Sequence, residues 1–165
     1  AGDGRAGDAL SYADEELRAD ETIVLAAVKV APQALQHAAP ELLADRKFAE
    51  RAVKLDWRCL ASVSKDLRAD KKLVESALKQ SADALALTPL DADPKVALVA
   101  VKKDGLALCH CRPSAQTKDV VLAAVKQNVE ALQFVADESL LRDKDVVAAA
   151  KKRGVVLEGD DDDDE

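Results

Sequence analysis

The chain has 165 residues; 48% of them are hydrophobic but only 2% are aromatic, and the formal net charge is −7. This length suffices for one domain with a core of its own, and that core must be built from Ala, Val and Leu because large rings are nearly absent. No apolar run approaches the ~18 residues that cross a bilayer, and no hydrophobic signal segment is seen, so we expect no membrane span.

The chain begins with a short glycine-rich stretch and then becomes repetitive. Residues 1–8 are predicted to form a flexible N-terminal segment. After them a leucine recurs at intervals of 23 to 25 residues. A fixed period of this size is the signature of a protein built from structural repeats. The recurring leucines are Leu10, Leu35, Leu60, Leu85, Leu108, Leu132 and Leu157.

The first half of each repeat has apolar residues at helical spacing. In the first copy these are Leu10, Ala13 and Leu17, three and four residues apart, which places them on one helical face. The pattern predicts a short helix. It is too short to be stable alone, because isolated helices under ~12–15 residues are marginal in water.

The second half of each repeat predicts another helix, which begins at a capping residue. These residues are Asp20, Asp45, Asp70, Asp93, Thr117 and Asp143. With each of them counted as position 0, apolar side chains at positions +3, +4, +7 and +8 share one face. Position +7 is always alanine, which favours a close crossing of neighbouring helices. Position +9 is always lysine, which suits the negative end of the helix dipole.

These two halves predict an all-α fold, an α-solenoid of about six helix–turn–helix repeats of 23–26 residues. The repeat domain is expected to cover residues 9–158. The fourth copy is shortened around Thr88 and Pro89, and the fifth has a different lead-in, residues 112–116, so we expect altered turns there. In the sixth copy Lys151 takes the last apolar position, which indicates a terminal cap.

The net negative charge is concentrated at the end of the chain. Asp160 to Glu165 are six consecutive acids, and the remainder has 25 acidic and 24 basic residues. Residues 159–165 are therefore predicted to form an acidic disordered tail, with an electrostatic contact or a weak divalent-ion site as the alternative. A near-neutral body also argues against nucleic acid as a partner.

The repeated text resembles the domain-of-unknown-function family numbered 4116. The resemblance rests on segments such as ALSYADEELRADETIVLAAVK and LASVSKDLRADKKLVESALKQ, and it covers residues 8–157. It implies tandem helical repeats of a kind common in algae and other protists. It implies no activity, cofactor or catalytic residue.

One repeat position gathers unusual side chains and is the candidate partner-binding row. If the repeats stack, these side chains form a line, which either binds a partner or shields the groove between helices. Trp57, the sole tryptophan, stands beside Arg58 and is either a plug in its turn, a cation–π partner or an exposed anchor. The row consists of Tyr12, His37, Ser62, Leu87, His110 and Phe134.

Cys109, His110 and Cys111 resemble a metal site, but the repeat alignment puts Cys111 in a buried small position. Neighbouring helical residues also point ~100° apart, so we expect a structural cysteine and no metal or other cofactor. Three cysteines are a low, odd number, which favours a reducing intracellular compartment.

The sequence contains no recognised nucleotide-binding or nucleophile motif, so we expect no enzyme. The leading hypothesis is a non-enzymatic repeat protein that mediates protein–protein interaction or scaffolds a larger assembly. The alternative is an accessory subunit of an organellar complex that carries a cofactor, for instance a photosynthetic complex in a plastid. Peripheral association with a membrane complex is compatible with either hypothesis.

Overall fold

A computed structural model describes residues 9–157, and in this range the chain forms helices and turns without a strand. The predicted all-α repeat fold is confirmed. The chain divides into two compact units between Pro89 and Leu90. The predicted segments 1–8 and 159–165 lie outside the described residues. No helix in the described range is both long and apolar enough to cross a membrane.

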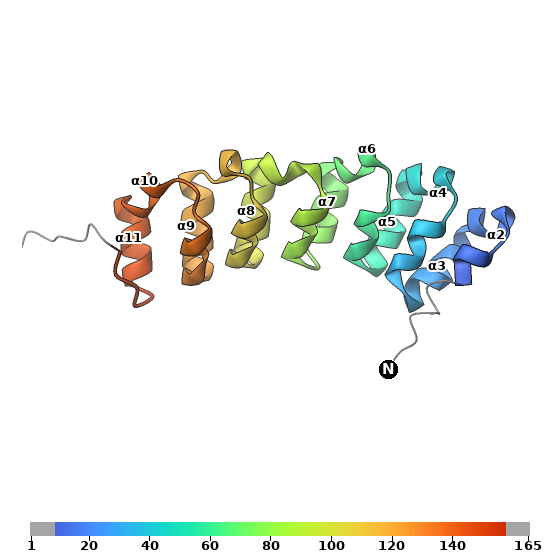
Figure 1. Cartoon of the computed structure of the whole chain (residues 1–165), viewed down its shortest axis with the longest axis horizontal. Helices are drawn as coiled ribbons and strands as arrows, with labels where there is room; N and C mark the ends of the chain where they lie inside the picture. Colours follow the sequence, from blue (N-terminus) through green and yellow to red (C-terminus); the bar gives the residue numbers. More distant parts are fainter. Residues whose placement is uncertain (1–8, 158–165) are drawn as a thin grey trace, which may run out of the picture. The chain divides into compact units, whose positions relative to one another are not determined.

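Each repeat contributes one longer helix, and within each unit these long helices lie side by side (Figure 1). The long helices of the first unit are α3 (Glu21–Val30), α5 (Arg46–Leu55) and α7 (Lys71–Leu78). Those of the second unit are α8 (Pro94–Lys103), α9 (Lys118–Gln127) and α11 (Lys144–Lys151).

The connections between long helices are short helices, in which η denotes a 3-10 helix. In the first unit they are η1 (Ala9–Tyr12), α2 (Glu15–Ala19), η2 (Pro32–His37), α4 (Pro40–Ala44), η3 (Trp57–Ala61), α6 (Lys65–Arg68) and η4 (Ala82–Leu87). At the division and in the second unit they are η5 (Pro89–Ala92), η6 (Gly105–His110), η7 (Pro113–Ala115), η8 (Val129–Phe134) and α10 (Glu138–Leu141).

The predicted starts of the long helices are confirmed at all six capping residues. The five aspartates accept hydrogen bonds from backbone N–H groups of the first turn, for example from Phe48 N to Asp45 Oδ1 at 2.7 Å. Thr117 occupies the cap position without such a side-chain bond. Because these N–H groups have no partner inside the helix, the caps fix where each helix begins.

The predicted close crossing at position +7 is supported by the burial of its alanines. Ala52, Ala77, Ala100, Ala124 and Ala150 are fully buried where neighbouring long helices pack. Ala27 in α3 is half-buried, so the burial at this position is complete in five of the six long helices. A methyl group at this position lets the helix axes approach closely.

The first half of each repeat differs from the single short helix that we predicted. It is a 3-10 helix followed, in most repeats, by a separate short α-helix. Between the two short helices, a backbone N–H group donates to a backbone carbonyl of the preceding repeat. Examples are Ala39 N to Arg18 O (2.9 Å) and Ser64 N to Leu43 O (2.8 Å). A continuous helix would use these N–H groups internally, so the contact between repeats interrupts it.

Candidate functional site

The structure places the candidate partner-binding row at equivalent points of the 3-10 helices. Five of its residues are the last residue of their 3-10 helix, and Ser62 caps η3. Tyr12 is 88% exposed and the others are half-buried. Within each unit the 3-10 helices contact one another in order, so these side chains do lie in rows. Whether the rows bind a partner stays a prediction. The five residues are Tyr12, His37, Leu87, His110 and Phe134.

Trp57 begins η3 and is half-buried. The Arg58 guanidinium lies 5.1 Å from the centre of its ring, so the cation–π contact considered from the sequence is present. Arg58 Nη1 also pairs with Asp56 Oδ2 at 3.0 Å. The Trp57 backbone N–H donates to Gln80 Oε1, which follows α7, and Gln80 in turn donates to Val53 O of α5, so Trp57 lies at the junction between these two long helices.

The Cys–His–Cys segment is split by burial. Cys111 is buried, as the repeat alignment predicted, and its thiol donates to Ala107 O at 3.5 Å, whereas Cys109 is exposed. Burial in the core is the main cause that raises the pKa of Cys111 to about 12. In the described part of the chain no group of three or more His, Cys, Asp or Glu could hold a metal ion.

A second feature, which the sequence analysis missed, is the separation of charge within each unit. The long helices and the turns that follow them carry eight cations and three carboxylates in the first unit, and nine and two in the second. The connecting segments carry four cations and ten carboxylates in the first unit, and two cations and seven carboxylates in the second. All the long-helix cations are exposed. They are Lys29, Arg46, Lys47, Arg51, Lys54, Lys71, Lys72 and Lys79, and Lys95, Lys102, Lys103, Lys118, Lys126, Lys144, Lys151, Lys152 and Arg153.

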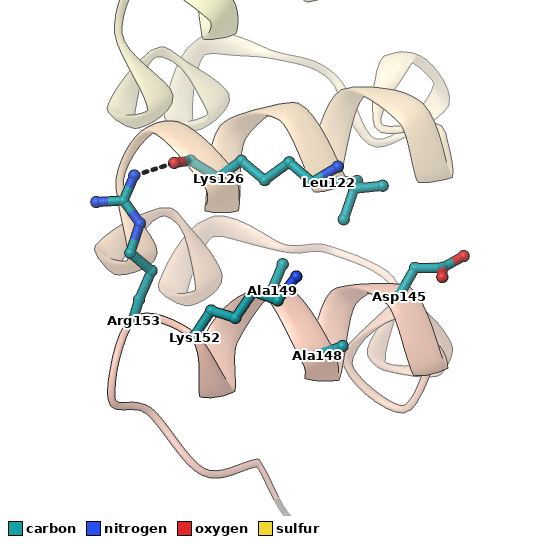
Figure 2. A pocket seen from close by; sticks show the side chains of 7 residues that line it. All are labelled: Leu122, Lys126, Asp145, Ala148, Ala149, Lys152 and Arg153. Carbon is teal, nitrogen blue, oxygen red and sulfur yellow. Dashed lines mark hydrogen bonds between the residues drawn. The ribbon is translucent and has the colours of Figure 1, made fainter.

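We call the exposed side of the long helices the long-helix face, and each unit has a groove on it. In the first unit the groove between α3 and α5 has a volume of about 430 Å³. In the second unit the groove between α9 and α11 has a volume of about 240 Å³ (Figure 2). The first is lined by Thr22, Leu25, Ala26, Lys29, Arg51, Lys54 and Leu55, and the second by Leu122, Lys126, Asp145, Ala148, Ala149, Lys152 and Arg153.

The two grooves are built from the same repeat positions. Position +5 of the leading helix supplies a leucine, Leu25 or Leu122, and position +9 supplies a lysine on each wall. Positions +6, +9 and +10 of the following helix occur in both linings, so five of the seven positions of each lining are shared. A repeated surface thus forms twice in one chain, which indicates that it follows from the repeat itself.

The groove charges differ in how they are engaged. Arg51 pairs with Glu21 across the first groove, and Arg153 donates to Lys126 O across the second. At one end of the second groove Asp145 pairs with Lys118 at 2.6 Å. The four wall lysines at position +9 form no ion pair with a described residue, so their charges face the solvent. They are Lys29, Lys54, Lys126 and Lys152.

Lys118 is the most strongly engaged cation near these grooves. Its ammonium group lies 2.8 Å from Asp143 Oδ2 as well as 2.6 Å from Asp145 Oδ2. Hydrogen bonding from Lys118 lowers the pKa of the Asp143 carboxyl, and the same contacts raise the pKa of Lys118. This ion-pair cluster links the start of α9 to the start of α11.

The charge separation could have been found from the repeat alignment. Counting acids and bases over the whole body gave a near-neutral sum, which concealed that basic residues favour positions within the second half of the repeat. Tallying charge by repeat position would have shown the basic face. The grooves themselves could not be predicted, because they depend on how far apart adjacent long helices pack.

Comparison with known families agrees with this architecture. The sequence profile of the domain of unknown function DUF4116 matches three tandem segments, residues 5–43, 45–91 and 93–138. The chain belongs to the DUF4116 family. The second and third segments begin at the capping residues Asp45 and Asp93 and each covers two long helices, whereas the first segment covers one, α3. No curated protein and no solved structure matches the chain significantly.

Proposed function

We propose that this DUF4116 protein is a non-enzymatic repeat protein that binds other proteins through its long-helix face and holds them in an assembly. The observation that supports this best is the pair of grooves built from the same repeat positions. Repeat proteins commonly use such a recurring surface to contact an extended partner, because each repeat adds the same contact at a regular step.

The composition of the grooves fits an interface better than a catalytic site. Each has an apolar floor, with a cation on both walls, which resembles the apolar centre and polar rim of protein interfaces. The groups with clearly shifted pKa values do not converge in a groove: the thiols of Cys59 and Cys111 lie in the core, and Asp137 and Asp143 cap helices. The remaining one, Lys118, is held by Asp143 and Asp145 and lines neither groove. An enzyme would bring such groups together.

Photo-crosslinking from single positions tests this proposal. A photoreactive amino acid is placed at Ala26 or Ala148, which are exposed and line the grooves, and the matched controls are the exposed Ala61 and Ala136 on connecting segments. In an extract of the source cells we expect one defined adduct from the groove positions and none from the controls. Adducts from Ala61 and Ala136 alone would move the binding site to the candidate partner-binding row and contradict the proposal.

A further inference from the structure

We propose that the two grooves bind acidic peptide segments in which an apolar side chain is flanked by carboxylates. This inference rests on the proposed function and adds the chemistry of the partner. It is carried by three properties of the grooves: the solvent-facing lysines on their walls, the apolar floor between those lysines, and the spacing of the repeat.

The walls supply the charge complementarity. Lys29 and Lys54 border the first groove, and Lys126 and Lys152 border the second. All four are exposed and form no ion pair with a described residue, so a carboxylate can reach them without displacing an existing partner. The carboxylates in the linings are already engaged or absent: Asp145 binds Lys118, and the first groove is lined by no acid among the described residues.

The floor supplies a place for an apolar side chain. Leu25 lies under the first groove and Leu55, which is 43% exposed, lines its side; Leu122 and Ala149 have the corresponding role in the second. Figure 2 shows the Lys126 side chain extended along α9 toward Leu122, so its methylene groups add to the apolar surface. A partner that carried charge alone would leave this surface exposed to water.

The same floor argues for a peptide over a nucleic acid. Single strands bind to basic grooves largely by stacking their bases on aromatic rings. The one aromatic residue in the long helices is Phe48, which is fully buried, so the described part of the long-helix face offers no ring for stacking. A leucine-lined groove fits an aliphatic side chain instead.

The repeat sets the spacing of the acids. Neighbouring helices pack ~8–10 Å apart, and a peptide in the polyproline II conformation rises ~3.1 Å per residue with three residues per turn, so side chains three residues apart share one side. The lysines at position +9 of adjacent long helices therefore match carboxylates about three residues apart. The peptide that fits best has an acid at every third position and an apolar residue between consecutive acids.

Fluorescence anisotropy with synthetic peptides tests the proposal on the full chain. The probe is a fluorescein-labelled Glu-Leu-Ser-Glu-Leu-Ser-Glu, measured at ~150 mM salt so that weak surface attraction is screened. One control peptide has Gln for each Glu, and a second has Ala for each Leu. A third copies the acidic run Asp160–Glu165, which has six acids but no apolar side chain. We expect each control to bind at least ~10-fold more weakly than the probe.

Matched variants locate the binding. The doubles Lys29→Gln/Lys54→Gln and Lys126→Gln/Lys152→Gln each remove two wall lysines from one groove, and both together are expected to weaken probe binding at least ~10-fold. The control, Lys65→Gln/Arg142→Gln, removes two exposed cations from connecting segments and should leave binding unchanged. Because all these positions are exposed, we expect the circular dichroism of the variants to match that of the parent chain.

Several results would overturn the inference. Equal binding of the Gln peptide would exclude recognition of carboxylates, and tighter binding of the acidic-run peptide would mean that charge alone suffices. An oligouridylate that displaces the probe at lower concentration would point to nucleic acid. If crosslinks from Ala26 or Ala148 capture a partner while the acidic probe fails to bind, the proposed function stands and only the acidic-peptide inference fails.

Discussion

In each unit a glutamine at position +10 of a long helix joins that helix to the preceding one. The residue whose backbone N–H donates to the glutamine differs between the units. In the first unit Gln80 donates to Val53 O and accepts from the backbone N–H of Trp57. In the second, Gln127 donates to Lys103 O and accepts from the N–H of Gly105. The glutamine binds only backbone groups, and the residue whose N–H it accepts from is tryptophan in the first unit and glycine in the second.

The difference shows how much space there is for a side chain at the first residue of each 3-10 helix. A Cβ atom on Gly105 would lie 2.4 Å from Ala124 O and 3.0 Å from Asn128 N, which are backbone atoms of α9 and of its C-cap residue. At Trp57 the first unit leaves room for a complete indole. In both units the glutamine oxygen accepts from the first N–H of a 3-10 helix, but the carbonyl that accepts from the glutamine is at position +8 in the first unit, Val53, and at position +10 in the second, Lys103.

The largest expected effect is the protection of one buried thiol in each unit, which makes it possible to follow the two units separately. Burial is the main cause that raises the pKa of Cys59 and of Cys111 to about 12, so almost no thiolate forms at neutral pH. In the folded chain we expect both to react with a thiol reagent at least ~10³-fold more slowly than the exposed Cys109. The measurement is the labelling rate of each cysteine by mass spectrometry.

In a Cys109→Ser background the rates at Cys59 and Cys111 then report the opening of the first and of the second unit. Rates for either thiol close to that of Cys109 would mean that its unit is open in solution. Identical rates at every denaturant concentration would mean that the two units open together.

The next largest effect concerns the cores. Phe48 is fully buried at position +3 in the first unit, where the second unit has Val96, Val120 and Val146. Phe48→Ala leaves a large cavity and should cost ~3–5 kcal/mol in the free energy of unfolding. Val120→Ala removes two methylene equivalents and should cost ~2 kcal/mol. Urea unfolding measures both changes.

Thiol labelling shows whether each core belongs to its own unit. Phe48→Ala should accelerate the labelling of Cys59 more than that of Cys111, and Val120→Ala should do the reverse. Equal acceleration of both thiols by either substitution would contradict two separately stable units.

The contrast between capping residues and groove residues shows what the sequence reveals. The capping aspartates and the alanines at position +7 act locally or at every repeat, so periodicity exposed them. The separate 3-10 helices were not predicted, because the break depends on hydrogen bonds to the preceding repeat, as from Ser64 N to Leu43 O. The role of Leu25 and Leu122 was hidden for a similar reason, since a groove depends on the distance between two helices.

A smaller effect is expected where the second unit is most tightly joined. Gly105→Ala forces backbone atoms apart and should destabilise the chain by ~1–3 kcal/mol, measured by urea unfolding. Ala82 occupies the same position in the fourth repeat, so alanine as such is compatible with the 3-10 helix. A Gly105→Ala chain as stable as the parent would show that α9 can move away from η6 at no cost.

The glutamines themselves should contribute less, because both are exposed. Gln80→Ala and Gln127→Ala each remove two hydrogen bonds to the backbone, and we expect each to cost ~1 kcal/mol in thermal or urea unfolding. Similar costs in the two units would support a junction that depends on backbone groups alone. A cost confined to Gln80 would instead indicate that the Trp57 ring holds this junction together.

The smallest effect is a dependence on pH in the second unit. The Asp143 carboxyl has a pKa below its ordinary value of 3.8, chiefly because Lys118 donates to it. A lowered carboxyl pKa means that the ion pair stabilises the fold above about pH 4 and that this contribution is lost as the pH falls through the lowered value. Asp143→Asn should therefore lower the melting temperature at neutral pH and flatten its dependence on pH between about 2 and 5.

Asparagine is chosen because it also caps helices, so the change removes the charge while keeping a capping oxygen. Lys118→Gln removes the same ion pair from the other side and should flatten the pH profile in the same way. In the first unit Arg46 makes the equivalent contact, 3.2 Å from Asp70. If Lys118→Gln left the pH profile unchanged while Asp143→Asn altered it, the dependence on pH would arise from the cap of α11 and not from the contact between its repeat and the one before.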